Sequence, residues 1–166
     1  MERTSFADMP CAIARSLDQV GEGWSLLILR DALLGARRFQ DFEERLAIPP
    51  NTLTRRLRTL CQRGLLERKR YTQRPPRDEY ALTEKGRDLL PVLLVLAAWG
   101  NRWLAPDGPA LVPVDAQTGR RVEPVVVDRR TLRLLEPGSV ALKAGPAAPP
   151  SLRRALARPA VFGGQS

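Results

Sequence analysis

Histidine is absent from this 166-residue chain, and cysteine occurs only twice, at Cys11 and Cys61. Two cysteines are too few for a disulfide framework, and without histidine the usual ligand sets of a structural zinc site cannot be assembled. The same absence removes the most frequent general base and every nucleophile that depends on histidine. No glycine-rich phosphate loop of the GxGxxG or GxxxxGKS type occurs either. We therefore expect no enzyme, no metal and no cofactor; a small enzyme would need a convergent carboxylate or lysine site, which is not visible.

The chain also lacks an apolar run of membrane-spanning length and a charged-then-apolar leader. With 43% hydrophobic residues, its length suits one domain with a real core plus an appendage. We expect a soluble, cytoplasmic protein with no membrane partner.

Acidic residues are missing from the stretch IPPNTLTRRLRTLCQRG, residues 48–64. The whole block 36–77 holds twelve basic residues and four acidic ones, a net charge of +8 out of +9 for the chain. Because nearly the entire excess lies in one short block, a polyanionic partner is favoured over a generally basic surface.

Apolar spacing predicts short helices over 10–20, 24–34 and 37–47, the second of them nearly encircled by apolar side chains and therefore buried. Pro49 and Pro50 mark a tight turn before another helix that runs to about residue 63, on which Leu53, Leu57 and Leu60 face the core. Residues 65–83 alternate like a hairpin around the loop TQRPPRD. Thr83 can cap a helix over 84–106 that Pro91 should kink or divide.

A helix-turn-helix followed by a hairpin is a winged helix, so we predict a mainly α fold with a small β wing over residues 1–104. The polar face of the second helix would enter the DNA major groove, while basic residues on the wing would contact phosphates or the minor groove. The predicted DNA-contacting residues of the helix are Asn51, Thr52, Thr54, Arg55, Arg56 and Arg58, and those of the wing are Arg74 and Arg77. The alternatives are an ordinary solvated face, a solvated turn, or a winged helix that binds only proteins.

The long helix carries more apolar surface than a small winged helix can cover, which favours a homodimer. The predicted interface residues are Leu93, Leu96, Trp99 and Trp103 on this helix and Ile13 and Leu17 on the first helix. The alternative is that the C-terminal extension covers this surface. We expect that extension to be small and β-rich over 105–144, and the tail 145–166 to be disordered or at most to hold a transient basic helix.

Residues 10–104 resemble the HxlR-type transcriptional regulators, which are MarR-like winged-helix proteins of bacteria. The matching motifs are GxWSLLILRD, RRFxDF, LTRRLRTL, RGLLERKRY and PPRDEYALTEKG. The resemblance implies a homodimer that binds a palindromic double-stranded DNA operator as a repressor or autoregulator, and it adds Arg37 and Arg38 to the predicted DNA contacts. Relatives often have Ser where this chain has Pro49, so Asn51 would cap the recognition helix or its first turn would be looser.

Cys11 matches an N-terminal cysteine that senses quinones, aldehydes or other electrophiles in some members of that family. Here Arg15 lies one turn away and a helix begins nearby, and both can raise thiolate reactivity. The resemblance therefore allows a redox, electrophile or small-ligand effector, although a small buried cysteine is the simpler reading. Cys61 is expected to pack against the core.

Overall fold

The computed structural model describes residues 5–73 and 76–163, and Arg74 therefore lies outside the described residues. The chain divides into two compact units, Met1–Leu104 and Ala105–Ser166. Among the described residues, no helix combines the length and the apolar character needed to cross a membrane.

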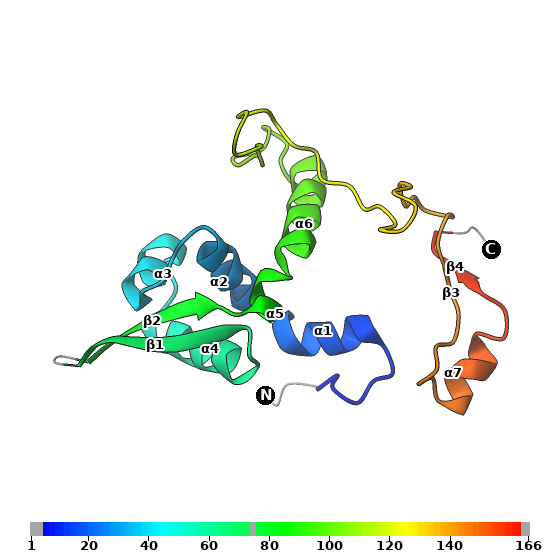
Figure 1. Ribbon diagram of the computed structural model, residues 1–166, viewed down its shortest axis with the longest axis horizontal. Coiled ribbons are helices and arrows are strands. Elements are labelled where there is room, and N and C mark those ends of the chain that lie inside the picture. Colours follow the sequence, from blue (N-terminus) through cyan, green and yellow to red (C-terminus); the bar gives the residue numbers. More distant parts are fainter. Residues whose placement is uncertain (1–4, 74–75, 164–166) are drawn as a thin grey trace. The chain divides into compact units, whose positions relative to one another are not determined.

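The first unit begins with four helices and continues into a two-stranded hairpin (Figure 1). The helices are α1 (Ala12–Val20), α2 (Gly23–Leu33), α3 (Phe39–Leu46) and α4 (Pro50–Gln62). Strands β1 (Leu66–Gln73) and β2 (Pro76–Leu82) pair antiparallel, with a register shift between Arg70 and Thr72. This order of elements confirms the predicted winged helix-turn-helix with its β wing.

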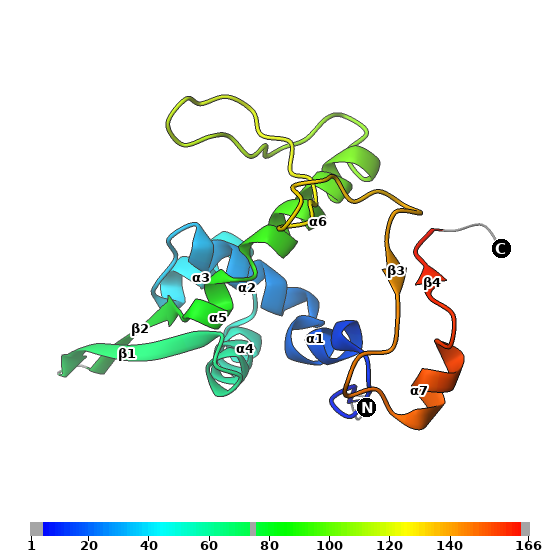
Figure 2. The same ribbon diagram turned by 45° about the vertical axis from the view of Figure 1, so that its right-hand side comes forward.

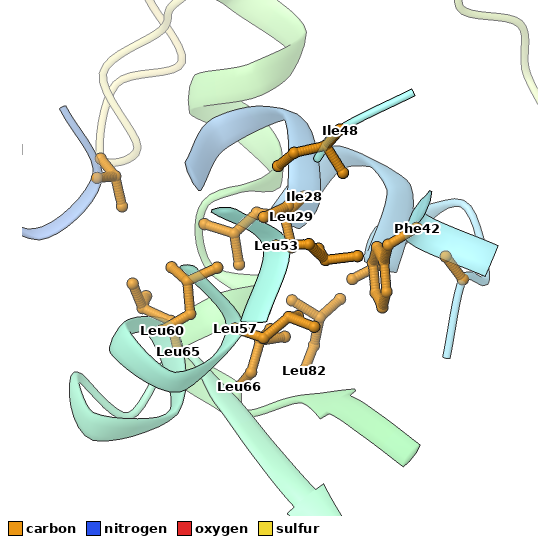
Figure 3. Packing of buried hydrophobic residues seen from close by; sticks show 13 residues of the cluster. Ile28, Leu29, Phe42, Ile48, Leu53, Leu57, Leu60, Leu65, Leu66 and Leu82 are labelled. Carbon is orange, nitrogen blue, oxygen red and sulfur yellow. The ribbon is translucent and has the colours of Figure 1, made fainter. Parts of the chain in front are cut away.

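The core lies where α2, α3, α4 and the base of the wing meet (Figure 3). Leu53, Leu57 and Leu60 of α4 are fully buried, as their spacing predicted. Their side chains pack in one cluster with those of Ile28, Leu29, Phe42, Ile48, Leu65, Leu66 and Leu82. One face of α4 is thus fixed against the core, which leaves its opposite face outward.

Helix α2 is less enclosed than the sequence predicted. Ile28 and Leu29 are completely buried, but Leu34, the residue that ends the helix, is 64% exposed and Leu27 is also exposed. Apolar residues occur all around α2, but only one side of the helix packs against the small core. The apolar side chains on the other side stay exposed.

The helix predicted after the wing is divided in two, as the proline in it suggested. Helix α5 (Glu84–Arg87) begins at Thr83, whose hydroxyl accepts a hydrogen bond from Gly86 N at 3.1 Å. Helix α6 (Leu90–Trp103) starts after a short break, with Pro91 in its first turn, where a missing N–H costs nothing. No residue of α6 is buried.

The second unit carries short strands and a helix. Strands β3 (Ala141–Leu142) and β4 (Ala160–Val161) pair antiparallel, and α7 (Pro150–Ala155) lies between them in sequence (Figure 2). The β-rich character of the region is confirmed, but residues 113–134 pair only through the isolated bridges Val114–Arg121 and Val127–Leu134. In the tail, where we expected disorder or at most a transient basic helix, α7 carries Arg153 and Arg154. Val161 pairs with Ala141 of the earlier strand, and Arg153 donates hydrogen bonds to two backbone oxygens near α7.

Candidate nucleic-acid interface

Helix α4 begins without a side-chain cap. Pro49 precedes it in an extended conformation (φ −57°, ψ 133°), and the Pro49 carbonyl accepts hydrogen bonds from Thr52 N at 2.9 Å and Leu53 N at 3.0 Å. Proline at the first helical position has the φ that a helix requires. Asn51 lies inside the first turn, so the expectation that it caps the helix is wrong, and its exposed side chain is available to a partner.

The outward face of α4 is polar and basic. Asn51, Thr54, Arg55 and Arg58 are exposed, and Thr52 is partly exposed. The Thr54 hydroxyl donates a hydrogen bond to the Pro50 carbonyl at 2.9 Å, so its proton is already used. The methyl group and the lone pairs of the hydroxyl oxygen are left to contact a partner. A face with these groups and no acid suits contact with base edges and phosphates in the major groove.

Arg56 does not belong to that face. Its side chain is 15% exposed and forms an ion pair with Glu22, the residue before α2, whose side chain is 25% exposed. Arg56 follows Leu53 by three positions, so it sits on the flank of α4 that turns toward α2. We therefore remove Arg56 from the candidate DNA contacts.

Some arginines of the wing form ion pairs within the hairpin, and another remains exposed at the surface. Arg68 and Arg70 of β1 both pair with Asp78 of β2, the Arg70 Nε to Asp78 Oδ1 distance being 3.3 Å. The hydrogen bond from Arg68 is the main reason why the pKa of Asp78 is lowered. Arg77 is exposed at the end of β2 that adjoins the loop, where a wing would meet a DNA backbone.

The segment before α3 joins the wing. Tyr80 N donates to the Arg37 carbonyl at 2.7 Å, and Arg38 Nε lies 3.4 Å from Glu79 Oε1. The Arg38 guanidinium also stacks over the Tyr71 ring, 4.9 Å from its centroid. Arg37 and Arg38 are both exposed, and the antiparallel bridge between Arg38 and Glu79 places this segment along one edge of the wing.

Asp41 fixes the position of this segment. It accepts hydrogen bonds from Arg38 N at 2.8 Å and Arg37 N at 2.9 Å. These backbone donors, Arg38 first, lower the pKa of Asp41 below its ordinary value. The carboxylate thus holds the backbone of both arginines while their side chains remain outward.

A groove of about 450 Å³ separates α4 from the wing, and the sequence did not predict it. Its lining includes Arg58 and Gln62 of α4 together with Arg68 and Tyr80 of the wing. Only the pairing of the hairpin against the helix brings these residues together, because they lie up to 22 positions apart in the chain.

The two cysteines differ in environment. Cys11 is exposed and immediately precedes α1. Cys61 is half-buried against the core, where burial raises the pKa of its thiol and so disfavours the thiolate. Its position agrees with the packing role that the sequence suggested.

Five of the six predicted interface residues are large apolar side chains with strong exposure: Ile13 at 63%, Leu17 at 47%, Leu96 at 47%, Trp99 at 53% and Trp103 at 63%. The sixth, Leu93 on α6, is partly buried. Helices α1 and α6 therefore carry apolar side chains that the core of the first unit does not cover.

Comparison with known proteins identifies the family. The family model described as HxlR-like helix-turn-helix matches residues 19–108. The chain belongs to the HxlR-like helix-turn-helix family. Its curated relatives include the uncharacterized HTH-type transcriptional regulator MT3179 of Mycobacterium tuberculosis (strain CDC 1551 / Oshkosh), which is 43% identical over 117 residues, or 70% of this chain and 74% of that protein. This member of the HxlR-like family is accordingly a helix-turn-helix transcriptional regulator and not an enzyme.

Solved structures share the fold. PA1607 is 34% identical, with a TM-score of 0.78, and the match covers 86% of this chain and 100% of PA1607. The redox regulator HypR in its reduced form is also 34% identical, with a TM-score of 0.53, but the match covers only 58% of this chain and 99% of HypR. The likeness to PA1607 therefore extends past the winged helix into residues 105–166.

Proposed function

We propose that this HxlR-like regulator binds a palindromic DNA operator as a homodimer and acts as a repressor or autoregulator of transcription. The observation that carries the proposal is the outward face of α4, which has no acid and exposes Asn51, Thr54, Arg55 and Arg58. A solvated helix face normally carries acids as well as bases, whereas a DNA-reading face must be rich in donors.

The groups divide by chemistry. Arg55 and Arg58 are the side chains on α4 that can donate two parallel hydrogen bonds to guanine O6 and N7 or to a phosphate. Thr54 offers a methyl group to thymine, since its hydroxyl proton is held by Pro50 O. Arg77 and Arg37 lie on the wing and the adjoining loop, and we assign them to phosphates beside the major groove.

A salt series on the full-length protein tests this assignment. The Arg55→Gln/Arg58→Gln double variant should lower the slope of log affinity against log salt by about two units on duplex DNA. Arg154→Gln is the matched control, since Arg154 is an exposed arginine on α7 outside the winged helix. An unchanged slope in the double variant would remove α4 from the interface. No duplex binding at low salt would favour the protein-interaction reading.

The homodimer is supported by the exposed apolar side chains of α1 and α6. Side chains as large as Trp99 and Trp103 are rarely left this exposed in a monomer, and a second copy offers a complementary surface of the same kind. Pairing through these helices would hold two copies of α4 about one duplex turn apart. The alternative is that the C-terminal unit of the same chain, and not a second copy, covers these apolar side chains.

Sedimentation measurements distinguish a homodimer from a monomer whose apolar side chains are covered by its own C-terminal unit. Wild-type protein should sediment as a dimer at micromolar concentration, and Trp99→Glu should sediment as a monomer that has lost most of its operator affinity. Leu34→Glu is the matched control, because Leu34 is 64% exposed but lies at the C-cap of α2, outside both α1 and α6. A monomeric wild type would contradict the dimer and favour cover by the chain itself.

A redox or electrophile effector is the second candidate, and a non-thiol small ligand remains an alternative to it. It is favoured by the exposed position of Cys11 before α1 and by the fold shared with the redox regulator HypR. Treatment with a quinone should release DNA from the wild type and not from Cys11→Ser. Equal release from both proteins would exclude Cys11 as the sensor.

A further inference from the structure

The C-terminal unit contains two similar ten-residue modules whose equivalent positions are 13 residues apart. The first module covers residues 113–122 and the second covers residues 126–135. Valine, aspartate, threonine and arginine recur at equivalent places, as Val114 and Val127, Asp115 and Asp128, Thr118 and Thr131, and Arg120 and Arg133.

The two modules also share one hydrogen-bond pattern. In the first, the Thr118 hydroxyl donates to Asp115 Oδ1 at 2.8 Å, and Asp115 N donates to Arg120 O at 2.8 Å. In the second, the Thr131 hydroxyl donates to Asp128 Oδ2 at 2.7 Å, and Asp128 N donates to Arg133 O at 2.9 Å. Each aspartate is thus committed to its own turn, and both tips have the same backbone.

The modules differ at the residue after the threonine. Gly119 has φ +68°, a conformation that glycine adopts without steric cost. Leu132 occupies the same position with φ +56° in the second module, where a side chain is strained. Its side chain is 75% exposed, so no packing within the unit offsets the strain.

Three arginines lie within three positions of this leucine in the sequence. Arg129, Arg130 and Arg133 are exposed, and in the described part of the chain none of them forms an ion pair with an acid. The charge of Arg133 contributes to lowering the pKa of Asp128 in the same turn, after the hydrogen bonds from Arg130 N and Thr131, but its guanidinium forms no ion pair there. The tip therefore presents one exposed apolar side chain flanked by exposed guanidinium groups. This combination fits the DNA minor groove, where arginines follow the narrow, electronegative channel and apolar side chains press between base steps.

We propose that the second module is a DNA-binding arm, in which Arg130 and Arg133 contact phosphates and Leu132 packs into the minor groove. The proposal rests on the proposed function, because the arm would add its contacts to a duplex already held by α4 and the wing. It also gives the strained Leu132 a role that the first module, with Gly119, does not have.

Three variants of the full-length protein test the arm on a duplex selected by the wild type. Arg130→Gln/Arg133→Gln should lower the log-log salt slope by about two units, whereas the control Arg154→Gln/Arg158→Gln should leave it within about half a unit. Leu132→Gly should weaken binding about tenfold without changing the slope, since it removes apolar contact and no charge. Its melting temperature should equal or exceed that of the wild type, because the strain is relieved.

Several results would overturn the arm. An unchanged slope in Arg130→Gln/Arg133→Gln, or a slope change equal to that of the control, would show that the module does not touch DNA. A lower melting temperature for Leu132→Gly would show that the leucine packs within the protein. If these variants bind like the wild type while Arg55→Gln/Arg58→Gln still lowers the log-log salt slope, the arm proposal is wrong and the proposed function stands. If the wild type binds no duplex DNA, both are wrong.

Discussion

Arg56→Gln should destabilise the protein without removing a DNA contact, although Arg56 lies among the arginines of the recognition helix. Its side chain is 15% exposed and pairs with Glu22, which is 25% exposed. Exposed pairs contribute about 0–1 kcal/mol, and breaking a buried pair costs about 3–5 kcal/mol. A pair of intermediate exposure should therefore contribute about 2 kcal/mol to the free energy of unfolding.

That loss is large enough to measure. For a domain of about 100 residues, 1 kcal/mol corresponds to about 5 °C in melting temperature, so Arg56→Gln should melt about 10 °C below the wild type. Arg55→Gln is the matched neighbour, because Arg55 is exposed and should change stability by less than about 0.5 kcal/mol.

The two variants should also separate in DNA binding. Arg55→Gln should lower the log-log salt slope by about one unit, while Arg56→Gln, measured below its melting temperature, should retain the wild-type slope. The reasoning would be refuted if Arg56→Gln kept the wild-type melting temperature and lost a unit of slope, since the side chain would then face the phosphates.

Three further predictions concern stability. Leu57→Ala should lower the free energy of unfolding in urea by about 3 kcal/mol, because Leu57 is 0% exposed and the cavity would lie at the centre of the core; a loss below about 1 kcal/mol would contradict this packing. Gly86→Ala should cost about 2 kcal/mol, since a Cβ there would lie 2.2 Å from the Leu65 carbonyl oxygen, whereas Gly23→Ala meets nothing within 4 Å and should be nearly neutral. Asp41 has a pKa below its ordinary 3.8, so its contribution to stability is present above about pH 4 and is lost as the pH falls through the lowered value; Asp41→Asn should be destabilised at pH 7 and should lose less stability than the wild type on acidification to pH 2.

The winged helix could be predicted from the sequence because the spacing of apolar residues and the residues at helix starts match the side chains that are buried and the helix bounds in the structure. The spacing of Leu53, Leu57 and Leu60 identified the buried face of α4, and Thr83 and Pro91 marked the helix starts after the wing. These features depend on residues a few positions apart, which is the range that periodicity and capping report.

Contacts between distant segments could not be predicted in the same way. We assigned Arg56 to the DNA face because the exposed part of the helix is rich in arginine. Its ion pair with Glu22 depends on the approach of α4 to the start of α2. The link between Arg38 and the wing residues Glu79 and Tyr71 likewise depends on tertiary pairing.

The C-terminal unit was the least predictable part of the chain. Its proline and glycine content suggested disorder or at most a transient basic helix beyond residue 145, and did not indicate that β4 pairs with a strand about 20 positions earlier. The repeat was hidden because the second module replaces Gly119 by Leu132, which removes the turn signal that glycine supplies.

Selection of bound duplexes from a random library tests most directly whether α4 reads DNA. We expect the wild type to enrich a palindrome with half-sites about one helical turn apart, or about 10 base pairs, and Thr54→Ala or Arg55→Gln to enrich an altered half-site. An absence of enrichment by the wild type, or the parental motif returned unchanged by both variants, would contradict the account.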